Sequence, residues 1–194
     1  MQFTLQKYVL QQTPDSSIQL MKDDKTDIII LRGCPGSGKS QTAKSLSQFF
    51  PKGVRLEVDT LRQMVISVDW KNQQEHINVL QLSTGLVYDF LKLGFSPVIV
   101  IDTFSGDKIN KYLDTLFQLD KELSIKIFGL FTTDVELKRR LDLRTFAEFK
   151  DFSICKKLND DVIKWKHFNE HQVDTTGLSP IQTAEKIYNQ INFG

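Results

Sequence analysis

The stretch Gly33-Cys34-Pro35-Gly36-Ser37-Gly38-Lys39-Ser40, which directly follows the run Asp27–Arg32, decides the fold of this chain. It matches the pattern G-x-x-x-x-G-K-[ST] without a mismatch. Glycines let a backbone adopt positive φ angles and bring its N–H groups close to phosphate oxygens. Lys39 supplies a positive charge for the β- and γ-phosphates, and the Ser40 hydroxyl is a ligand that suits Mg²⁺. The pattern therefore predicts a nucleoside triphosphate site.

The sequence on both sides of this loop fits that interpretation. An apolar run precedes it, and apolar residues then recur at helical spacing at Ala43, Leu46 and Phe50. A helix that begins near Gly38 directs the positive end of its dipole at the same phosphates. The predicted nucleotide-binding residues are Gly33, Cys34, Pro35, Gly36, Ser37, Gly38, Lys39, Ser40 and Gln41.

Composition limits the remaining possibilities. The 194 residues fit one domain, and a net charge of +1 gives no general basic field for nucleic acid, although a site for a nucleic-acid end stays open. The apolar runs are too short to cross a bilayer, so no membrane partner is expected. The two cysteines form no disulfide framework, and the N-terminus does not read as a signal peptide, so we expect a cytoplasmic protein.

Strand-like and helix-like segments alternate along the chain. The expected strands are 28–32, 54–58, 97–101, 125–131 and 172–175. A long helix is expected at 73–93, and another at 154–171 with Ile154, Leu158, Val162, Trp165 and Phe168 on one stripe. This alternation predicts an α/β domain over 27–194, a three-layer fold around a mainly parallel five-stranded sheet. Residues 1–26 read as an N-terminal extension of unknown role.

Three classes of phosphate-loop protein need to be separated. A GTPase should carry Asn-Lys-x-Asp, but the nearest stretch, 110–114, has one residue too many. A motor or remodelling ATPase usually places Glu directly after the strand Asp, and here Thr103 follows Asp102. A phosphotransferase needs Mg·ATP, a base and mobile arginines, and candidates for all of these are present. A module that binds ATP only as a regulatory ligand stays as an alternative of another class.

Two aspartates follow predicted strands at the edge where ligands of parallel sheets bind. Asp59 would face the γ-phosphate as a general base, and Arg62, one helical turn on, would bind an acceptor. The plainer interpretation makes Asp59 a helix cap and Arg62 a solvated residue. Asp102 would hold Mg²⁺ through a water and orient Ser40, or it would only cap the turn at 103–106.

A basic segment follows the fourth predicted strand. Thr133 and Glu136 have the spacing of a capping box and open a helix that carries Lys138, Arg139, Arg140 and, in the expected continuation, Arg144. Arg140 and Arg144 are four residues apart and are therefore expected on one face, as catalytic arginines of a helical lid over 139–152. A solvated basic helix is the alternative. The three histidines lack metal-type spacing and read as packing or surface residues.

The segments 29–40 and 58–64 together resemble the kinase domain of phage-type polynucleotide 5′-hydroxyl kinases and their zeta-toxin-like and chloramphenicol-phosphotransferase-like relatives. The resemblance implies strand order 2-3-1-4-5, with Asp59 as base and Arg62 as ligand of the acceptor phosphate. It also implies that 136–144 is the lid helix and that 173–180 is the final strand and the loop beside the nucleotide.

The same resemblance implies an ATP-dependent kinase whose acceptor is the 5′-hydroxyl of a polynucleotide end. A small hydroxylated molecule, such as a nucleoside, sugar nucleotide or antibiotic, is the alternative acceptor. Two departures from the family pattern stand out. Gln41 replaces the Thr that often follows Ser40, and Glu57-Val58 replaces the Asn-Arg that is frequent before the aspartate.

Overall fold

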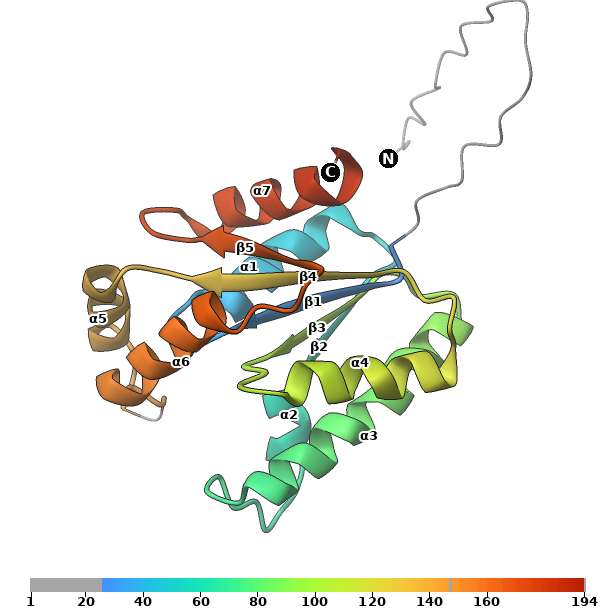
Figure 1. The fold of residues 1–194 in the computed structure, drawn as a ribbon, viewed down its shortest axis with the longest axis horizontal. Helices are drawn as coiled ribbons and strands as arrows, with labels where there is room; N and C mark the ends of the chain where they lie inside the picture. The colour runs from blue at the N-terminus through green and yellow to red at the C-terminus, as the bar shows by residue number, and fades with distance from the viewer. Residues whose placement is uncertain (1–25, 147, 194) are drawn as a thin grey trace, which may run out of the picture.

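The computed structural model describes residues 26–146 and 148–193, so all but the last residue of the predicted extension 1–26 lies outside the described part. Five parallel strands form one sheet in the order β2-β3-β1-β4-β5 (Figure 1), which confirms the predicted fold class and strand order. The strands are β1 (Ile28–Gly33), β2 (Val54–Glu57), β3 (Val98–Asp102), β4 (Ile125–Phe131) and β5 (Glu170–Asp174).

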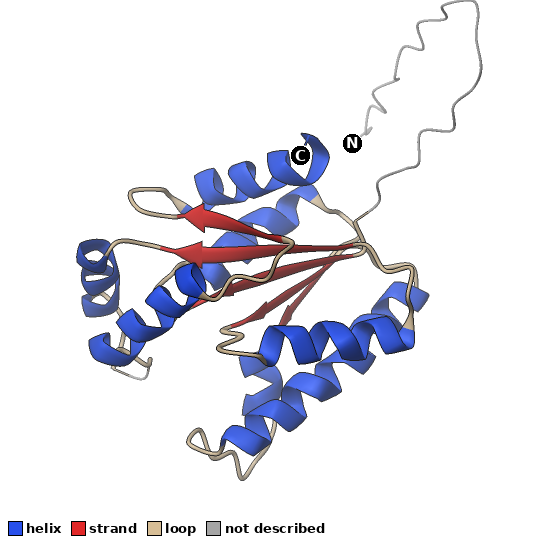
Figure 2. Ribbon diagram, in the orientation of Figure 1, coloured by secondary structure: helices blue, strands red, loops and turns tan. Residues whose placement is uncertain are grey.

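Helices cover both faces of this sheet (Figure 2), because side chains of the central strand alternate between two apolar layers. Ile29 and Leu31 pack with α1 and α7, whereas Ile28 and Ile30 pack with α3 and α4. Among the described residues, no helix combines the length and apolarity needed to cross a membrane. The helices are α1 (Lys39–Leu46), the 3₁₀ turn η1 (Ser47–Phe49), α2 (Val58–Gln63), α3 (Gln73–Lys92), α4 (Lys108–Leu119), α5 (Asp134–Asp142), α6 (Phe152–Lys164) and α7 (Pro180–Phe193).

Helix α6 departs most from the sequence-based expectation. It ends at Lys164 rather than at 171, and its buried face consists of Cys155, Asn159 and Val162. The predicted apolar stripe is confirmed for Leu158 and Val162, which pack inward. It is wrong for Trp165 and Phe168, which lie beyond the helix and are exposed. The carbonyl of Trp165 accepts a hydrogen bond from Arg32 instead of continuing the helix, which is a tertiary contact that periodicity does not report.

Helices α7 and α5 both begin with residues at capping-box spacing, but their caps differ. In α7 both reciprocal bonds form, since Ser179 N donates to Gln182 Oε1 at 2.9 Å and Gln182 N donates to Ser179 Oγ at 3.3 Å. In α5 only one of the two bonds forms: the Thr133 hydroxyl accepts a hydrogen bond from Glu136 N at 3.5 Å. The Glu136 carboxylate instead pairs with two arginines of its own helix, because opposite charges three and four residues apart meet on a helix surface.

A fully buried ion pair crosses β4 underneath α6. Arg32 Nη1, at the end of β1, lies 2.9 Å from Glu170 Oε2, at the start of β5, and both side chains are inaccessible to solvent. Gly129 makes room for this pair on the intervening strand, because a Cβ at that position would overlap the Glu170 carboxylate and meet Val162 at 3.0 Å. The ion pair therefore joins the end of the central strand β1 to the start of the edge strand β5, on the face of the sheet that α6 covers.

Replacing Glu170 alone by Leu should lower the free energy of unfolding by about 3–5 kcal/mol, because it leaves the Arg32 charge buried without its partner. The double variant Arg32→Met/Glu170→Leu should lose much less free energy of unfolding, since it has no buried charge at either position. Urea denaturation of the wild type, both single variants and the double variant measures the coupling. Additive losses would show that the two charges do not stabilise each other.

Candidate active site

The phosphate loop joins β1 to α1 in the conformation that its glycines allow. Gly36 and Gly38 have φ angles of +89° and +96°, in the region that favours glycine, and Gly38 caps the first turn of α1. An added Cβ at Gly36 would also lie 2.9 Å from Leu137 Cδ1 on α5. These two positions therefore require glycine for backbone conformation, and Gly36 also for its close contact with α5.

Arg140 of α5 holds the loop from outside. Its Nη1 donates to the carbonyls of Ser37 at 3.2 Å and Gly36 at 3.4 Å, and its Nη2 donates to the Thr175 carbonyl at 2.7 Å. Its Nε donates to Glu136 at 2.7 Å. All three nitrogens of the guanidinium thus bind protein acceptors, and Arg140 connects α5, the phosphate loop and the end of β5.

Lys39 lies at the first position of α1, and its Nζ donates to the Cys34 carbonyl at 3.1 Å. Burial lowers the pKa of the Lys39 ammonium, although the charges of Asp102 and Asp59 act in the opposite direction. Arg144 contributes a smaller lowering, so its guanidinium also lies within electrostatic reach of Lys39. The charges of Asp59, Asp102 and Arg144 thus all act on Lys39.

Arg144 does not share a helix face with Arg140, contrary to the expectation from their spacing. Helix α5 ends at Asp142, and Leu143 is its C-cap. Arg144 therefore lies after the helix, in the turn that follows. Its Nε donates to Glu148 at 3.1 Å. The two arginines therefore occupy different positions: Arg140 faces the outer carbonyls of the phosphate loop, whereas Arg144 lies in the connection toward α6.

Cys34 is a packing residue of the loop. Its buried thiol lies 3.7 Å from Asn159 Oδ1 on α6, and burial raises its pKa to about 11. Asn159 also pairs with both backbone groups of Thr132, at 3.1 and 2.8 Å, and so connects α6 to the end of β4 and to the loop. Burial and the raised pKa favour the protonated thiol, which is poorly reactive, and Asn159 is a supporting residue that sequence reasoning missed.

Asp59, Asp102 and His76 form one cluster, with one ligand atom of each within 4.8 Å of the others. Desolvation by surrounding protein, and then the charge of Asp102, raise the pKa of Asp59 above its usual range, although its residue surface is exposed. Burial opposes the ionisation of Asp102, but His76 and the Phe104 N–H, 3.0 Å from Oδ2, hold its pKa below the usual range. Asp102 thus caps its turn and still belongs to the cluster.

His76, at the start of α3, was predicted to be a packing or surface residue, but it is a buried member of the site. Arg62 Nη1 lies 3.2 Å from His76 Nδ1, and Nε2 lies 3.5 Å from Asp102 Oδ2. Because a guanidinium only donates, Nδ1 must accept, and the ring proton belongs on Nε2, where it faces the carboxylate. In this tautomer, neither nitrogen has a lone pair left for a metal.

Arg62 is buried, so its interpretation as a solvated helix residue is wrong. Besides His76, it donates to the carbonyls of Asp69 at 3.1 Å and Asn72 at 3.4 Å. The Trp70 ring stacks on its guanidinium, 4.7 Å from Cζ to the ring centroid. The structure therefore places Arg62 beside the cluster as predicted, with several of its donors directed at the segment between α2 and α3.

The residues of this edge fit a hard divalent cation. Two carboxylates, Asp59 and Asp102, remain as oxygen ligands once His76 is excluded, and the Ser40 hydroxyl is at the start of α1. Oxygen-only ligands suit Mg²⁺, whereas a catalytic zinc site would need more protein ligands of the nitrogen or sulfur type.

A pocket of about 330 Å³ opens on the other side of the phosphate loop. It lies between α1, α5 and the loop from β5 to α7, and its size suits the nucleoside part of a nucleotide. Gln41 is one of its lining residues, as are Arg140, Thr175, Ser179 and Pro180. The predicted nucleotide-side loop 173–180 therefore borders a cavity next to the predicted phosphate site.

Comparisons with known proteins agree with this geometry. A family model, AAA_33, described as an AAA domain, matches residues 28–165. No curated protein matches the sequence.

Many solved structures share the fold, among them the following three. The tunicamycin resistance protein of Deinococcus radiodurans is 20% identical, with a TM-score of 0.63, and the match covers 88% of this chain and 98% of that one. The APS kinase CysC of Mycobacterium tuberculosis, solved with AMPPNP and APS, is 14% identical with a TM-score of 0.62, and the match covers 85% of this chain and 96% of that one. The Pnkp1/Rnl/Hen1 RNA repair complex is 22% identical with a TM-score of 0.61, and the match covers 77% of this chain and 48% of that one.

The tautomer assigned to His76 can be tested by substitution. His76→Leu should lower the free energy of unfolding by about 1–3 kcal/mol, because it leaves buried groups of Arg62 and Asp102 without partners. His76→Gln should lose less free energy of unfolding, since the amide oxygen of the new side chain can accept from Arg62 and its NH₂ group can donate to Asp102. Urea denaturation of both variants measures this difference. Equal losses would contradict the assigned hydrogen-bond pattern.

Proposed function

The chain belongs to the AAA_33 family of AAA domains, and from this premise and the geometry of the site we propose that it transfers the γ-phosphate of Mg·ATP to a hydroxyl group. The observation that carries the proposal is the convergence of the phosphate loop with Asp59 and Asp102 at one edge of the sheet. Phosphoryl transfer depends mainly on positioning and charge stabilisation, and this edge supplies groups for both.

The loop residues would bind the phosphates, and Gln41 with the 330 Å³ pocket would hold the nucleoside of the donor. Ser40 and Asp102 would hold Mg²⁺, which neutralises charge on the phosphates when it is bound. Lys39 would contact the β- and γ-phosphates, and Arg144 would add positive charge for the transferring group. Arg140 would act through the loop that it holds.

Asp59 is the better general base of the two aspartates. Its residue is exposed, so an acceptor hydroxyl can reach it, whereas Asp102 is buried and already accepts from Phe104. The raised pKa of Asp59 also favours proton uptake, because a base works best when its pKa approaches the working pH. Arg62, one turn along α2, would contact the acceptor.

For the acceptor we favour the 5′-hydroxyl of a polynucleotide end. The net charge of +1 suits a short single-stranded end better than a long duplex, because each phosphate contact normally needs its own Lys or Arg. The structures with this fold include the Pnkp1/Rnl/Hen1 RNA repair complex, which supports a nucleic-acid acceptor by analogy. A small hydroxylated molecule is the competing outcome.

Incubation with γ-labelled ATP, Mg²⁺ and matched panels of 5′-hydroxyl oligonucleotides and small hydroxylated metabolites tests the acceptor. We expect label in the oligonucleotides, with a shallow loss at higher salt because few phosphates are held. Lys39→Ala is the control, since the loss of a charged contact should weaken ATP binding by about tenfold or more.

Label that enters only small molecules would refute the polynucleotide acceptor. Tight ATP binding without transfer to any acceptor would refute the kinase and favour a regulatory module. Equal ATP affinity of the wild type and Lys39→Ala would contradict the phosphate site itself.

The role of Asp59 gives a separate prediction. Asp59→Asn should lower turnover by roughly 10²- to 10⁴-fold, the usual contribution of a general base, with little change in ATP affinity. Asp114→Asn, an exposed position on α4, is the matched control and should change neither quantity. Single-turnover kinetics and ATP titration of both variants measure these effects. Near-normal turnover of Asp59→Asn would show that Asp59 only belongs to the first turn of α2.

A further inference from the structure

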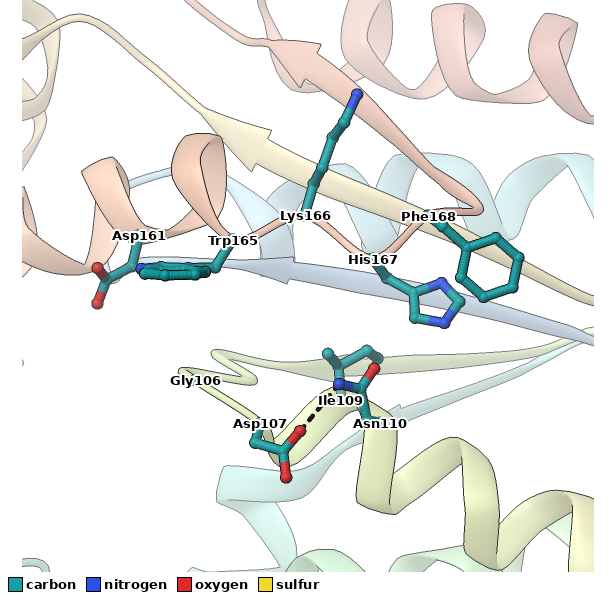
Figure 3. A pocket seen from close by; sticks show the side chains of 9 residues that line it. All are labelled: Gly106, Asp107, Ile109, Asn110, Asp161, Trp165, Lys166, His167 and Phe168. Carbon is teal, nitrogen blue, oxygen red and sulfur yellow. Dashed lines mark hydrogen bonds between the residues drawn. The ribbon is translucent and has the colours of Figure 1, made fainter.

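A second pocket, of about 540 Å³, lies apart from the phosphate loop, between α4 and the segment that follows α6. We call it the interhelix pocket. Trp165, His167 and Phe168 form one wall, and Figure 3 shows His167 pointing across toward Ile109 and Asn110 on the other wall. Its volume suits an organic ligand of the size of a nucleoside.

The aromatic wall is exposed and yet held in place. Trp165 is 58% and Phe168 is 85% exposed, so both rings have apolar surface that a ligand could cover. The buried ion pair fixes their backbone: Arg32 Nη1 donates to the Trp165 carbonyl at 3.1 Å, and Glu170 Oε2 accepts from His167 N at 3.1 Å. The segment 165–168 therefore presents aromatic rings on a preorganised backbone.

The polar groups of the pocket suit a flat ring with a polar edge. On the wall opposite the aromatics, Asn110 Nδ2 donates to Asp107 Oδ1 at 2.8 Å, which leaves the Asn110 amide oxygen as an acceptor. Asp107 Oδ2 lies 3.7 Å from Lys111 Nζ in an exposed ion pair and keeps lone pairs for a further donor. The charged lining residues are Lys166 and the two aspartates Asp107 and Asp161, so the lining has a net negative charge and does not favour a bare phosphate. Lys164 lies over the Trp165 ring, 5.0 Å from the centroid, at the rim.

One wall of the interhelix pocket follows the candidate active site closely along the chain. This wall, opposite the aromatic residues, begins at Gly106, four residues after Asp102. Lys108, between two lining residues, is close enough for its charge to interact with both Asp102 and Arg62. A single-stranded polynucleotide whose 5′ end lies at Asp59 would therefore pass Lys108 before it reaches the aromatic wall.

We propose that the interhelix pocket binds a nucleobase of a single-stranded polynucleotide acceptor, downstream of the 5′-hydroxyl that reacts. The base stacks on Trp165 or Phe168 and directs its amino edge at Asp107 and Asn110. This proposal rests on the proposed polynucleotide acceptor. It assigns the pocket as the site that holds the strand, because stacking on aromatic rings is the sequence-tolerant way to bind single strands.

The test compares wild-type protein with Trp165→Ala/Phe168→Ala, using 3′-labelled 5′-hydroxyl oligonucleotides of two and eight nucleotides in fluorescence anisotropy. The double variant should bind the octamer about tenfold or more weakly, since each stacked base contributes substantially, and should bind the dimer like the wild type. Phe117→Ala, which removes an exposed ring from α4 outside this pocket, is the matched control and should change neither affinity. Equal octamer affinities would overturn the proposal.

Photo-crosslinking of wild-type protein to 5-iodouracil-substituted octamers gives a second measurement that does not depend on the folding of a variant. Crosslinks at Trp165, His167 or Phe168 support the proposal, and crosslinks found only elsewhere overturn it. Phosphoryl transfer is measured separately. Pocket-dependent binding without transfer would refute the proposed function alone, whereas transfer with unchanged octamer affinity of the double variant would refute the pocket alone.

Discussion

The constraint on which this structure depends is the hydrogen bonding of the phosphate loop. A loop that turns its N–H groups toward phosphates must turn carbonyl groups outward, and buried carbonyls need donors. Arg140 and Thr175 bind the Ser37 carbonyl, and Lys39 binds that of Cys34. Because these donors come from α5, the end of β5 and α1, the loop takes its shape only when the elements around it are in place.

This arrangement also separates two environments at the edge of the sheet. On one side, the loop borders a pocket lined by α1, α5 and the start of α7. On the other side, two neighbouring aspartates differ in pKa. His76 and the Phe104 N–H lower the pKa of Asp102, whereas desolvation, and then the charge of Asp102, raise the pKa of Asp59. Burial and the repulsion between close carboxylates therefore give the two aspartates different pKa values at a single edge of the sheet.

Local patterns predicted the elements well where local contacts decide them. The continuous apolar run of β1 and the phosphate-loop motif both lie within a few residues, so the local sequence alone indicates them. The same reasoning failed at the end of α6, where Arg32 takes the Trp165 carbonyl, and at Glu136, which pairs with arginines instead of closing its cap.

The sequence by itself determined the α/β class, the strand order through family resemblance, and the position of the phosphate loop with its two aspartates. Only the tertiary structure decided that His76 belongs to the site, that Arg32 and Glu170 pair across Gly129, and that Arg140 and Arg144 separate. The physical reason is the sequence separation of the contacting residues. Periodicity and caps indicate contacts between neighbours along the chain, whereas each of these contacts depends on how distant segments pack, which no local pattern encodes.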